Sequence, residues 1–243
     1  MNDQLRDRLF AKPLGPVPQF TFDASVASVF PDMIERSVPG YATVVAISGM
    51  LAGEFSVPGS KLYDLGCSLG ATSIAMAAEC ASSCQVIAVD NSQPMIDRLQ
   101  EWLDAQQKPL PIQVSCDDIN NIEMHNASVV ALNYTLQFVA AELRSTLLQK
   151  VYQGMRDGGA LILSEKIALS HPDDDDLFVR MHHRFKKANG YSNLEVSQKR
   201  EALDKVLVPE SMQQHKDRLY ACGFKRVETW FQCFNFVSMV AIK

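Results

Sequence analysis

Apolar residues follow two different periods along this chain. Over residues 22–38 and 41–55 they recur at helical spacing, with Pro39-Gly40 between the two segments. From residue 61 onward, short apolar runs alternate with longer segments in which the spacing is again helical. The first pattern predicts a helical cap over residues 1–57, and the second predicts a sheet covered by helices.

The alternating part of the chain predicts a mostly parallel sheet. The expected strands are 61–65, 85–89, 112–116, 128–134 and 160–164, and the expected helices are 71–81, 93–106, 141–155 and 210–221. Strands joined through helices of this length lie parallel, with right-handed crossovers. Two β-rich segments, 225–232 and 234–242, end the chain and are joined too closely for a helix. They predict an antiparallel hairpin at the sheet edge.

A polar segment over residues 166–209 interrupts this alternation after the fifth strand. A segment in that position lies over the carboxyl ends of the strands, where open α/β sheets bind ligands, so we expect a helical lid. Its acidic run 173–176 is interpreted as a solvated helix start, since no metal-ligand spacing surrounds it. Its adjacent His182 and His183 point in different directions on a helix, so at most one is expected to face a site.

Composition narrows the class of protein. The 243 residues, 47% of them hydrophobic, suffice for one substantial core, so we expect a single domain over residues 1–243. A net charge of -5 argues against a broad nucleic-acid surface, which needs clustered Lys and Arg. No apolar run is long enough to span a bilayer and the N-terminus lacks a hydrophobic targeting segment, so we expect a cytoplasmic protein without membrane contact. The six cysteines form no regular framework and are interpreted as reduced thiols.

The candidate chemistry begins at the run Lys61-Leu-Tyr-Asp-Leu-Gly66-Cys-Ser-Leu-Gly70. It has the pattern of a strand followed by a glycine turn and a helix, and the next strand ends at Asp90. Such a turn brings backbone N–H groups to a ligand, while a carboxylate at the end of the second strand can grip ribose hydroxyls. The pattern therefore predicts a cradle for an adenosine-bearing cofactor.

Ser68 separates the two cofactor classes that use this layout. A dinucleotide fold requires glycine at this position, so that a pyrophosphate can approach the helix. The spacing Asp64-x-Gly66-x-x-x-Gly70 instead resembles the D/E-x-G-x-G-x-G loop of S-adenosylmethionine-dependent methyltransferases, with Ser68 in place of the middle glycine. The sequence leaves open whether Asp64 orders this loop or contacts the amino group of the cofactor.

Further motifs extend the resemblance over nearly the whole chain from residue 22 onward. They lie at residues 22–23, 29–41, 63–70, 88–92, 133–138, 163–166, 181–192, 197–200 and 230–236. In this arrangement they resemble the carboxy-S-adenosyl-L-methionine synthase family. The glycine turn alone is a weak signal, and the cap and the insert are the parts that distinguish this family.

The resemblance implies a Rossmann-like class I S-adenosylmethionine-dependent methyltransferase fold, an α/β fold with a mostly parallel seven-stranded sheet and an antiparallel C-terminal edge hairpin. It implies an enzyme that converts S-adenosyl-L-methionine and prephenate into carboxy-S-adenosyl-L-methionine, phenylpyruvate and water. That product is the donor for carboxymethylation of the wobble uridine of tRNA, which gives 5-oxyacetyluridine. In the family scheme, hydroxide released from prephenate takes a proton from the methyl group, so no conventional general base is expected.

The resemblance also implies site residues. Those expected to bind S-adenosylmethionine or the carboxylated product are Tyr41, Gly66, Cys67, Ser68, Asp90, Asn91, Asp118, Ile119, Asn133 and Arg200. Asp90 is expected to accept hydrogen bonds from the ribose, and Asn91 and Asp118 are expected beside the adenine. Arg200 is the expected catalytic residue, a clamp for the new carboxylate, and the family supplies it from the neighbouring subunit of a homodimer. No metal is expected, and the insert is the expected dimer element.

Two alternative functions remain open in the sequence. A conventional S-adenosylmethionine-dependent methyltransferase acting on a small molecule or tRNA would share the glycine turn, and a non-catalytic tRNA-associated scaffold would use the basic run 184–187. The overall acidity disfavours direct nucleic-acid binding. Prephenate is the expected partner molecule, with a functional link to a downstream tRNA carboxymethyltransferase. The residues that hold its carboxylates stay open, including any contribution of Arg184, Lys186 or Lys199.

Overall fold

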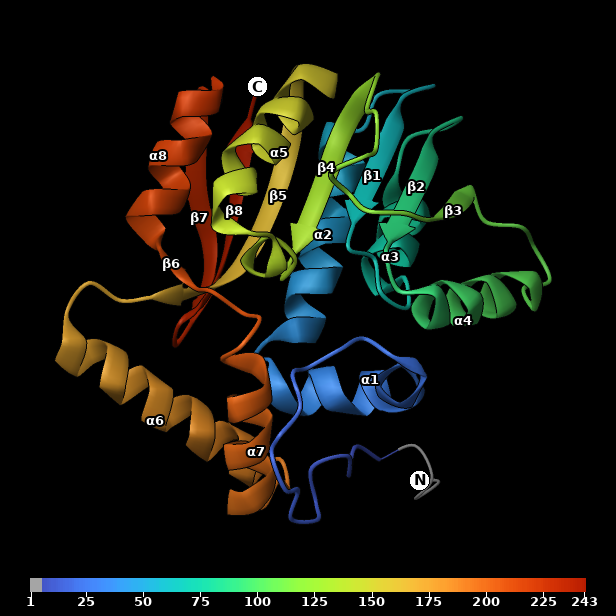
Figure 1. Cartoon of the computed structure of the whole chain (residues 1–243). Coiled ribbons are helices and arrows are strands. Elements are labelled where there is room, and N and C mark those ends of the chain that lie inside the picture. The colour runs from blue at the N-terminus through green and yellow to red at the C-terminus, as the bar shows by residue number, and fades with distance from the viewer. Residues whose placement is uncertain (1–5) are drawn as a thin grey trace.

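A sheet with helices on both faces forms the larger part of the molecule (Figure 1). The computed structural model describes residues 6–243, so residues 1–5 of the expected cap lie outside the described part. In chain order, the elements are α1 (Ala24–Ser37), α2 (Tyr41–Phe55), β1 (Lys61–Leu65), α3 (Ala71–Glu79), β2 (Gln85–Asp90), α4 (Gln93–Asp104), β3 (Ile112–Cys116), β4 (Ala127–Asn133), η2 (Leu136–Phe138), α5 (Ala141–Gly154), β5 (Met155–Ala168), α6 (Pro172–Ala188), α7 (Asn193–Leu203), β6 (Glu210–Ser211), α8 (Met212–Cys222), β7 (Arg226–Cys233) and β8 (Phe236–Ile242).

The strands follow the order β3-β2-β1-β4-β5-β8-β7, and the two-residue β6 lies beside β5. The pairs β1–β2, β2–β3, β1–β4 and β4–β5 are parallel. Strand β8 runs antiparallel to both β5 and β7. The predicted parallel sheet with an antiparallel C-terminal edge hairpin is therefore confirmed.

Strand β5 is longer than the sequence predicted, since it spans Met155–Ala168 rather than 160–164. Ser164 and Glu165 end the apolar run, yet both are fully buried within the strand. Ser164 Oγ lies 2.7 Å from Ser238 Oγ of β8, and the two strands stay paired beyond this point. Pairing with a neighbouring strand therefore extends β5 past the end of its local apolar pattern.

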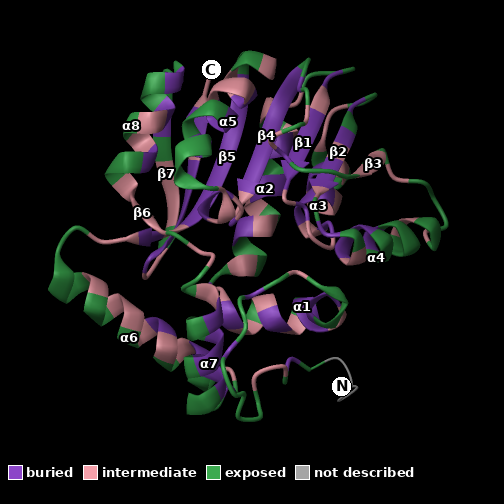
Figure 2. Ribbon diagram, viewed as in Figure 1, coloured by how far each residue is buried: buried purple, intermediate pink, exposed green. Residues whose placement is uncertain are grey.

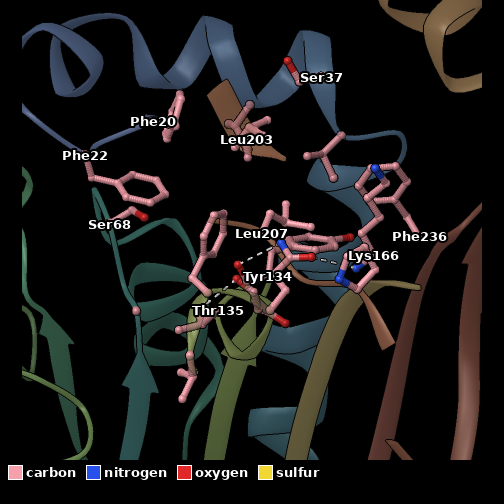
Figure 3. A pocket seen from close by; sticks show the side chains of 18 of the residues that line it. Phe20, Phe22, Ser37, Ser68, Tyr134, Thr135, Lys166, Leu203, Leu207 and Phe236 are labelled. Carbon is pink, nitrogen blue, oxygen red and sulfur yellow. Dashed lines mark hydrogen bonds between the residues drawn. The ribbon is translucent and has the colours of Figure 1, made fainter. Parts of the chain in front are cut away.

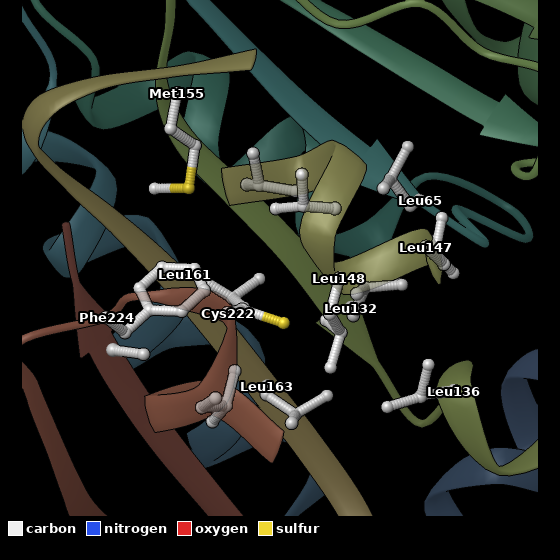
Figure 4. Close-up of a cluster of buried hydrophobic side chains, with 14 of the residues drawn as sticks. Leu65, Leu132, Leu136, Leu147, Leu148, Met155, Leu161, Leu163, Cys222 and Phe224 are labelled. Carbon is white, nitrogen blue, oxygen red and sulfur yellow. The ribbon is translucent and has the colours of Figure 1, made fainter. Parts of the chain in front are cut away.

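Helices cover both faces of the sheet, with α5 and α8 on one face and α2 and α3 on the other (Figure 1). Because no face of a parallel sheet is left to solvent, β4 is buried at every position from Ala127 to Leu132. Figure 2 shows the strands as the most buried part of the chain. Figure 4 shows part of this core, where Leu132 and Leu161 lie near Leu148 of α5. Burying one such leucine contributes about 2 kcal/mol to folding.

Helices α1, α6 and α7 form a further layer at the carboxyl ends of the parallel strands (Figure 1). The predicted helical insert is confirmed as α6 and α7, and a capping box between Ser192 and Glu195 begins α7. The side-chain amide of Gln198 on α7 donates hydrogen bonds to the carbonyl oxygens of Phe10 and Lys12. The N-terminal arm and the insert are thus held together on the side of the sheet where ligands bind in this class of fold.

A buried ion pair fastens the N-terminal arm to α7. The carboxylate of Asp7 lies 3.3 Å from Lys199 Nζ, and the two side chains are only 1% and 5% exposed. Asp7→Ala would leave the Lys199 ammonium buried without its carboxylate, so we expect the free energy of unfolding to fall by about 3 kcal/mol. Chemical denaturation measures this loss. Glu35→Ala, an exposed acidic residue on α1, is the matched control, and an equal effect of the two variants would contradict the prediction.

Within residues 6–243, none of the helices taken singly has the length and apolar character needed to cross a membrane. The pair α1 and α2 meets the length and composition test only when joined, and these helices are bent by 97° at their junction.

Candidate functional site

A cavity of about 580 Å³ lies between the carboxyl ends of the parallel strands and the layer of α1, α6 and α7. Its walls come from the glycine turn after β1, the ends of β2, β4 and β5, and the cap and insert helices. The position is where open α/β sheets bind ligands, and the volume falls in the range of roughly 300–1,000 Å³ that small-molecule sites occupy. Figure 3 shows Ser68 and Phe22 at one end of this cavity and Lys166 and Phe236 at the other.

Every site residue expected from the sequence lines this single cavity. They are Tyr41, Gly66, Cys67, Ser68, Asp90, Asn91, Asp118, Ile119, Asn133 and Arg200. The adjacent Asp117 does not line it. The structure thus brings these positions together, while the contact that each makes with a ligand stays a prediction.

Asp90, at the end of β2, is held by the turn that it faces. Its two carboxylate oxygens accept hydrogen bonds from the backbone N–H groups of Ser68 and Ser92, each at 2.9 Å. Burial raises the pKa of Asp90, and these two hydrogen bonds oppose the rise. Each carboxylate oxygen has a second lone pair, so the group can still accept hydrogen bonds from two hydroxyls of a ligand.

The glycine turn owes its shape to backbone angles that disfavour side chains. Gly66 has a φ of +83°, and a Cβ there would overlap the side chain of Thr135. Ser68, in the position of the middle glycine, has a φ of +47°. The N–H groups of Gly66 and Cys67 donate to the carbonyl of Val89 at 2.8 and 2.9 Å, which ties the turn to β2. The ligand-facing surface is therefore a strained turn held by two strands.

Gly66→Ala tests this account of the turn. The positive φ alone costs roughly 1–2 kcal/mol for a residue with a Cβ. Overlap with Thr135 adds to that cost, so we expect Gly66→Ala to lower the free energy of unfolding by more than Gly59→Ala does. Gly59 is the matched control because its φ is +74° and a Cβ there meets no atom within 4 Å. Equal losses in chemical denaturation of the two variants would show that Thr135 exerts no constraint.

Asp64 and Cys67 serve the turn differently. Asp64 is 1% exposed, lies outside the cavity lining and accepts a hydrogen bond of 2.6 Å from Ser73 Oγ on α3. Burial raises the pKa of Asp64 to about 7, and this geometry favours the loop-ordering role that the sequence left open. Burial likewise raises the pKa of the Cys67 thiol, which stays neutral in the cavity wall.

Asn133 is fixed in the cavity wall by three hydrogen bonds. Its side-chain nitrogen donates to Ser48 Oγ on α2 and to Thr72 Oγ1 on α3, each at 3.1 Å, and its side-chain oxygen accepts from Ser164 Oγ at 2.7 Å. Both amide hydrogens are therefore engaged, and the oxygen retains one lone pair toward a ligand. Burial also raises the pKa of neighbouring Tyr41, so this phenol stays protonated.

The insert and β5 bring a group of cationic and imidazole side chains to the far end of the cavity. These lining residues are Lys166, His182, His183, Lys186, Lys199 and Arg200. The expectation that at most one of the two adjacent histidines faces a site is wrong, because both line the cavity along which α6 lies. His182 Nε2 lies 2.7 Å from the carbonyl oxygen of Ser37, to which it donates, and burial lowers its pKa to about 2. This ring is therefore neutral.

Arg200 lies at the margin of this cationic end of the cavity. Its side chain is 54% exposed, and its Nε lies 3.5 Å from the carboxylate of Asp204. The guanidinium is therefore available to an entering anion, since its present partner is itself exposed. The supply of this arginine by a second subunit stays a prediction.

Glu165 positions a wall of the cavity, a role that sequence reasoning missed. Its buried carboxylate accepts hydrogen bonds of 2.9 Å from the backbone N–H groups of Leu136 and Gln137. These bonds position η2, whose Gln137 and Phe138 line the cavity. The acidic position inside an apolar strand was the only signal for it in the sequence.

Among residues 6–243, no group of three or more His, Cys, Asp or Glu side chains is placed to hold a metal ion.

Comparison with known proteins gives the fold class. Residues 62–159 match the family model described as a methyltransferase domain. A putative S-adenosyl-L-methionine-dependent methyltransferase from Methanococcus maripaludis superposes with a TM-score of 0.59 at 18% identity, covering 95% of this chain and 97% of that one. The magnesium protoporphyrin IX methyltransferase of Synechocystis with bound SAM superposes with a TM-score of 0.58 at 16% identity, covering 97% and 88%. The protein thus has the predicted Rossmann-like class I methyltransferase fold.

Three relatives match over essentially their whole length. The carboxy-S-adenosyl-L-methionine synthase of Haemophilus ducreyi is 52% identical over 98% of this chain and 98% of its own. The synthases of Vibrio cholerae and Histophilus somni are 52% and 50% identical, covering 98% of this chain and 97% and 99% of theirs. The chain belongs to the carboxy-S-adenosyl-L-methionine synthase family. The match covers the cap and the insert, so the similarity to this synthase family extends to the helices that enclose the cavity as well as to the sheet.

Proposed function

We propose that this protein is the enzyme that makes carboxy-S-adenosyl-L-methionine from S-adenosyl-L-methionine and prephenate, with phenylpyruvate and water as the other products. The observation that carries the proposal is the identity of 50–52% to synthases of that name over 98% of the chain. The cavity supports it, because it joins a nucleoside cradle at the glycine turn to a cationic end suited to carboxylates.

The glycine turn is the proposed site for S-adenosylmethionine. Asp90 accepts hydrogen bonds from the ribose hydroxyls through the lone pairs that Ser68 and Ser92 leave free. Gly66 and Cys67 are assigned to the methionine portion, which the backbone of the glycine turn can approach closely. The remaining contacts are assigned to Tyr41, Asn91, Asp118, Ile119 and Asn133, which line the same cavity.

In the proposed reaction, prephenate loses its ring carboxylate as carbon dioxide and its ring hydroxyl as hydroxide, and the ring becomes aromatic. The hydroxide takes a proton from the sulfonium methyl group and becomes water, while the methyl carbon forms a bond to the carbon dioxide. All atoms and charges are then accounted for without a proton acceptor from the protein. The tasks of the chain are to align the two substrates and to exclude water.

Aromatic side chains support the water-excluding role. Phe22 contacts Phe20 and Phe138 edge to face, with ring centroids 5.2 and 5.4 Å apart. All three line the cavity between the cap and η2. An apolar wall at this point limits the access of bulk water to the nucleoside end of the cavity.

Arg200 is the proposed clamp for the new carboxylate. A guanidinium remains charged at all working pH values and binds a carboxylate through two parallel hydrogen bonds. The homodimer, the cytoplasmic location and the supply of this donor for wobble-uridine carboxymethylation in tRNA belong to the same proposal. A complex with the downstream tRNA carboxymethyltransferase is not required by it, and co-purification of the two proteins tests for one.

The ligand carried by the purified protein tests the proposed function. Freshly purified protein is denatured, and the released small molecule is analysed by mass spectrometry. We expect a molecule heavier than S-adenosylmethionine by one carbon dioxide. Release of S-adenosylhomocysteine, with methylation of an added substrate, would favour the conventional methyltransferase instead.

A further inference from the structure

One end of the cavity carries more positive charge than its protein neighbours neutralise. Lys199 is paired with Asp7, and Arg200 is paired with Asp204. Lys166 and Lys186 also line the cavity, but within residues 6–243 neither ammonium group makes a hydrogen bond or an ion pair. Lys186 is only 5% exposed. Two unpaired lysine side chains from different elements, β5 and α6, therefore converge on this end.

The burial of Lys186 is unfavourable without an anion. Desolvation and, after it, repulsion from Lys199, Lys166 and Arg200 together lower its pKa to about 7, with Asp204 opposing the shift. Desolvation also lowers the pKa of Lys166. A buried ammonium is retained at a cost in stability unless a counter-charge and hydrogen bonds compensate for it. Asp204 attracts Lys186 without forming an ion pair with it, and no hydrogen bond from residues 6–243 satisfies its ammonium group, so a bound anion is the partner that would compensate for the burial.

We propose that Lys166 and Lys186 form a receptor for the two carboxylates of a dianionic substrate. This inference rests on the proposed function, under which the dianion is prephenate, and it assigns the side chains that hold it. Two ammonium groups from separate elements match two carboxylates at separate positions on one molecule. Each lysine contributes up to three N–H donors, which the protein leaves free.

The position of the receptor suits the reaction. Lys166 lies at the end of the cavity opposite Ser68 and the nucleoside cradle (Figure 3). Because one of the two carboxylates is the group that leaves the ring, a dianion held there brings its reacting carboxylate to the same end of the cavity as Arg200, which is assigned to the carboxylate that forms. The histidine next to the receptor, His182, is neutral and fixed by Ser37, so it does not compete for the anion.

The same geometry excludes two other candidates. Arg184 is on α6 with Lys186 but is exposed and does not line the cavity. Lys199 lines the cavity but already has the carboxylate of Asp7. Of the three side chains left open by the sequence, only Lys186 is therefore both directed into the cavity and unpaired.

Binding of prephenate to protein saturated with S-adenosylhomocysteine tests the receptor without turnover. Isothermal titration calorimetry at pH 7 compares wild type with Lys186→Met and Lys166→Met. We expect each variant to bind prephenate at least tenfold more weakly while its affinity for S-adenosylhomocysteine stays within twofold. Arg184→Met is the matched control, since it removes a positive charge from the same helix, and it is expected to bind prephenate as wild type does.

A stability measurement separates a receptor lysine from a structural one. The unfolded chain holds the Lys186 proton up to its ordinary pKa of 10.5, whereas the folded chain releases it near 7. The full cost of the buried charge is thus present below pH 7 and declines as the pH rises toward 10.5. Lys186→Met is therefore expected to raise the melting temperature of the ligand-free protein at pH 6.5, whereas loss of a stabilising contact would lower it.

The pH dependence of prephenate binding gives a third readout. Because the receptor needs a charged Lys186, wild-type affinity is expected to fall between pH 6.5 and 8.5, by at most about tenfold per pH unit. In Lys186→Met this fall is expected to flatten. Wild type and Lys186→Met share the other titratable or charged side chains at this end, so a difference between their pH profiles reports on Lys186. These shared side chains are Lys166, His182, His183, Lys199, Arg200, Asp175 and Asp204.

The outcomes distinguish the receptor from the proposed function. If wild type binds prephenate and Lys186→Met and Lys166→Met bind it equally well, the receptor is overturned and the function stands. If a variant loses affinity for prephenate and for S-adenosylhomocysteine to the same extent, its lysine has a structural role and the receptor proposal is again overturned. If wild type itself fails to bind prephenate, the proposed function falls and the receptor assignment falls with it.

Discussion

Arg200→Ala is expected to weaken the binding of carboxy-S-adenosylmethionine about a hundredfold while leaving the affinity for S-adenosylmethionine within twofold. A hydrogen bond to a charged group is worth about 1.5–3 kcal/mol, and each 1.4 kcal/mol is a factor of ten in affinity. A guanidinium that binds only the added carboxylate has no comparable partner in S-adenosylmethionine. Calorimetric titration of both ligands measures the two effects separately.

Two further variants sharpen this prediction. Arg200→Lys keeps the charge but loses the planar pair of donors, so an intermediate loss is expected. Arg184→Ala removes an exposed arginine outside the cavity and is expected to change neither affinity. An equal loss of affinity for both ligands in Arg200→Ala would contradict the clamp role, because the side chain would then support the whole site rather than bind one carboxylate.

Asp90→Ala is expected to reduce the affinity for S-adenosylhomocysteine about a thousandfold. The carboxylate is proposed to accept two ribose hydroxyls, and two charge-assisted hydrogen bonds of about 1.5–3 kcal/mol each account for an effect of that size. The substitution also leaves the N–H groups of Ser68 and Ser92 without their acceptor, which loosens the turn. Calorimetric titration of the folded variant checks the result.

The control for Asp90→Ala is Asp97→Ala, an exposed carboxylate on the adjoining α4. It is expected to bind S-adenosylhomocysteine like wild type, and Asp90→Asn, which keeps one acceptor oxygen, is expected to fall between the two. A loss smaller than threefold in Asp90→Ala would place the ribose elsewhere in the cavity.

The parts of the fold with a strong local signal were predictable from the sequence. The apolar runs that became β1 and β3 were predicted with the bounds that the structure has, at 61–65 and 112–116. The close spacing of 225–232 and 234–242 correctly predicted the antiparallel hairpin. In each case the signal lies within a few neighbouring residues, where period and turn chemistry act.

The parts that depend on distant contacts were not predictable to the same degree. The helix expected at 210–221 begins at Met212, because Glu210 and Ser211 pair with the end of β5 as β6. The cavity lining was predicted through family motifs, which mark ligand-facing positions. The convergence of Lys166 with Lys186 was missed, since it depends on how α6 lies relative to β5 and leaves no pattern in the sequence.

The central claim is that the methyl carbon of S-adenosylmethionine gains the carboxylate that prephenate loses. The most direct measurement is mass spectrometry of a reaction with prephenate that carries ¹³C in its ring carboxylate. The account predicts a product heavier than S-adenosylmethionine by one labelled carbon dioxide, formed in equal amount with phenylpyruvate. An unlabelled carboxylated product, or S-adenosylhomocysteine with no carboxylated product, would contradict it.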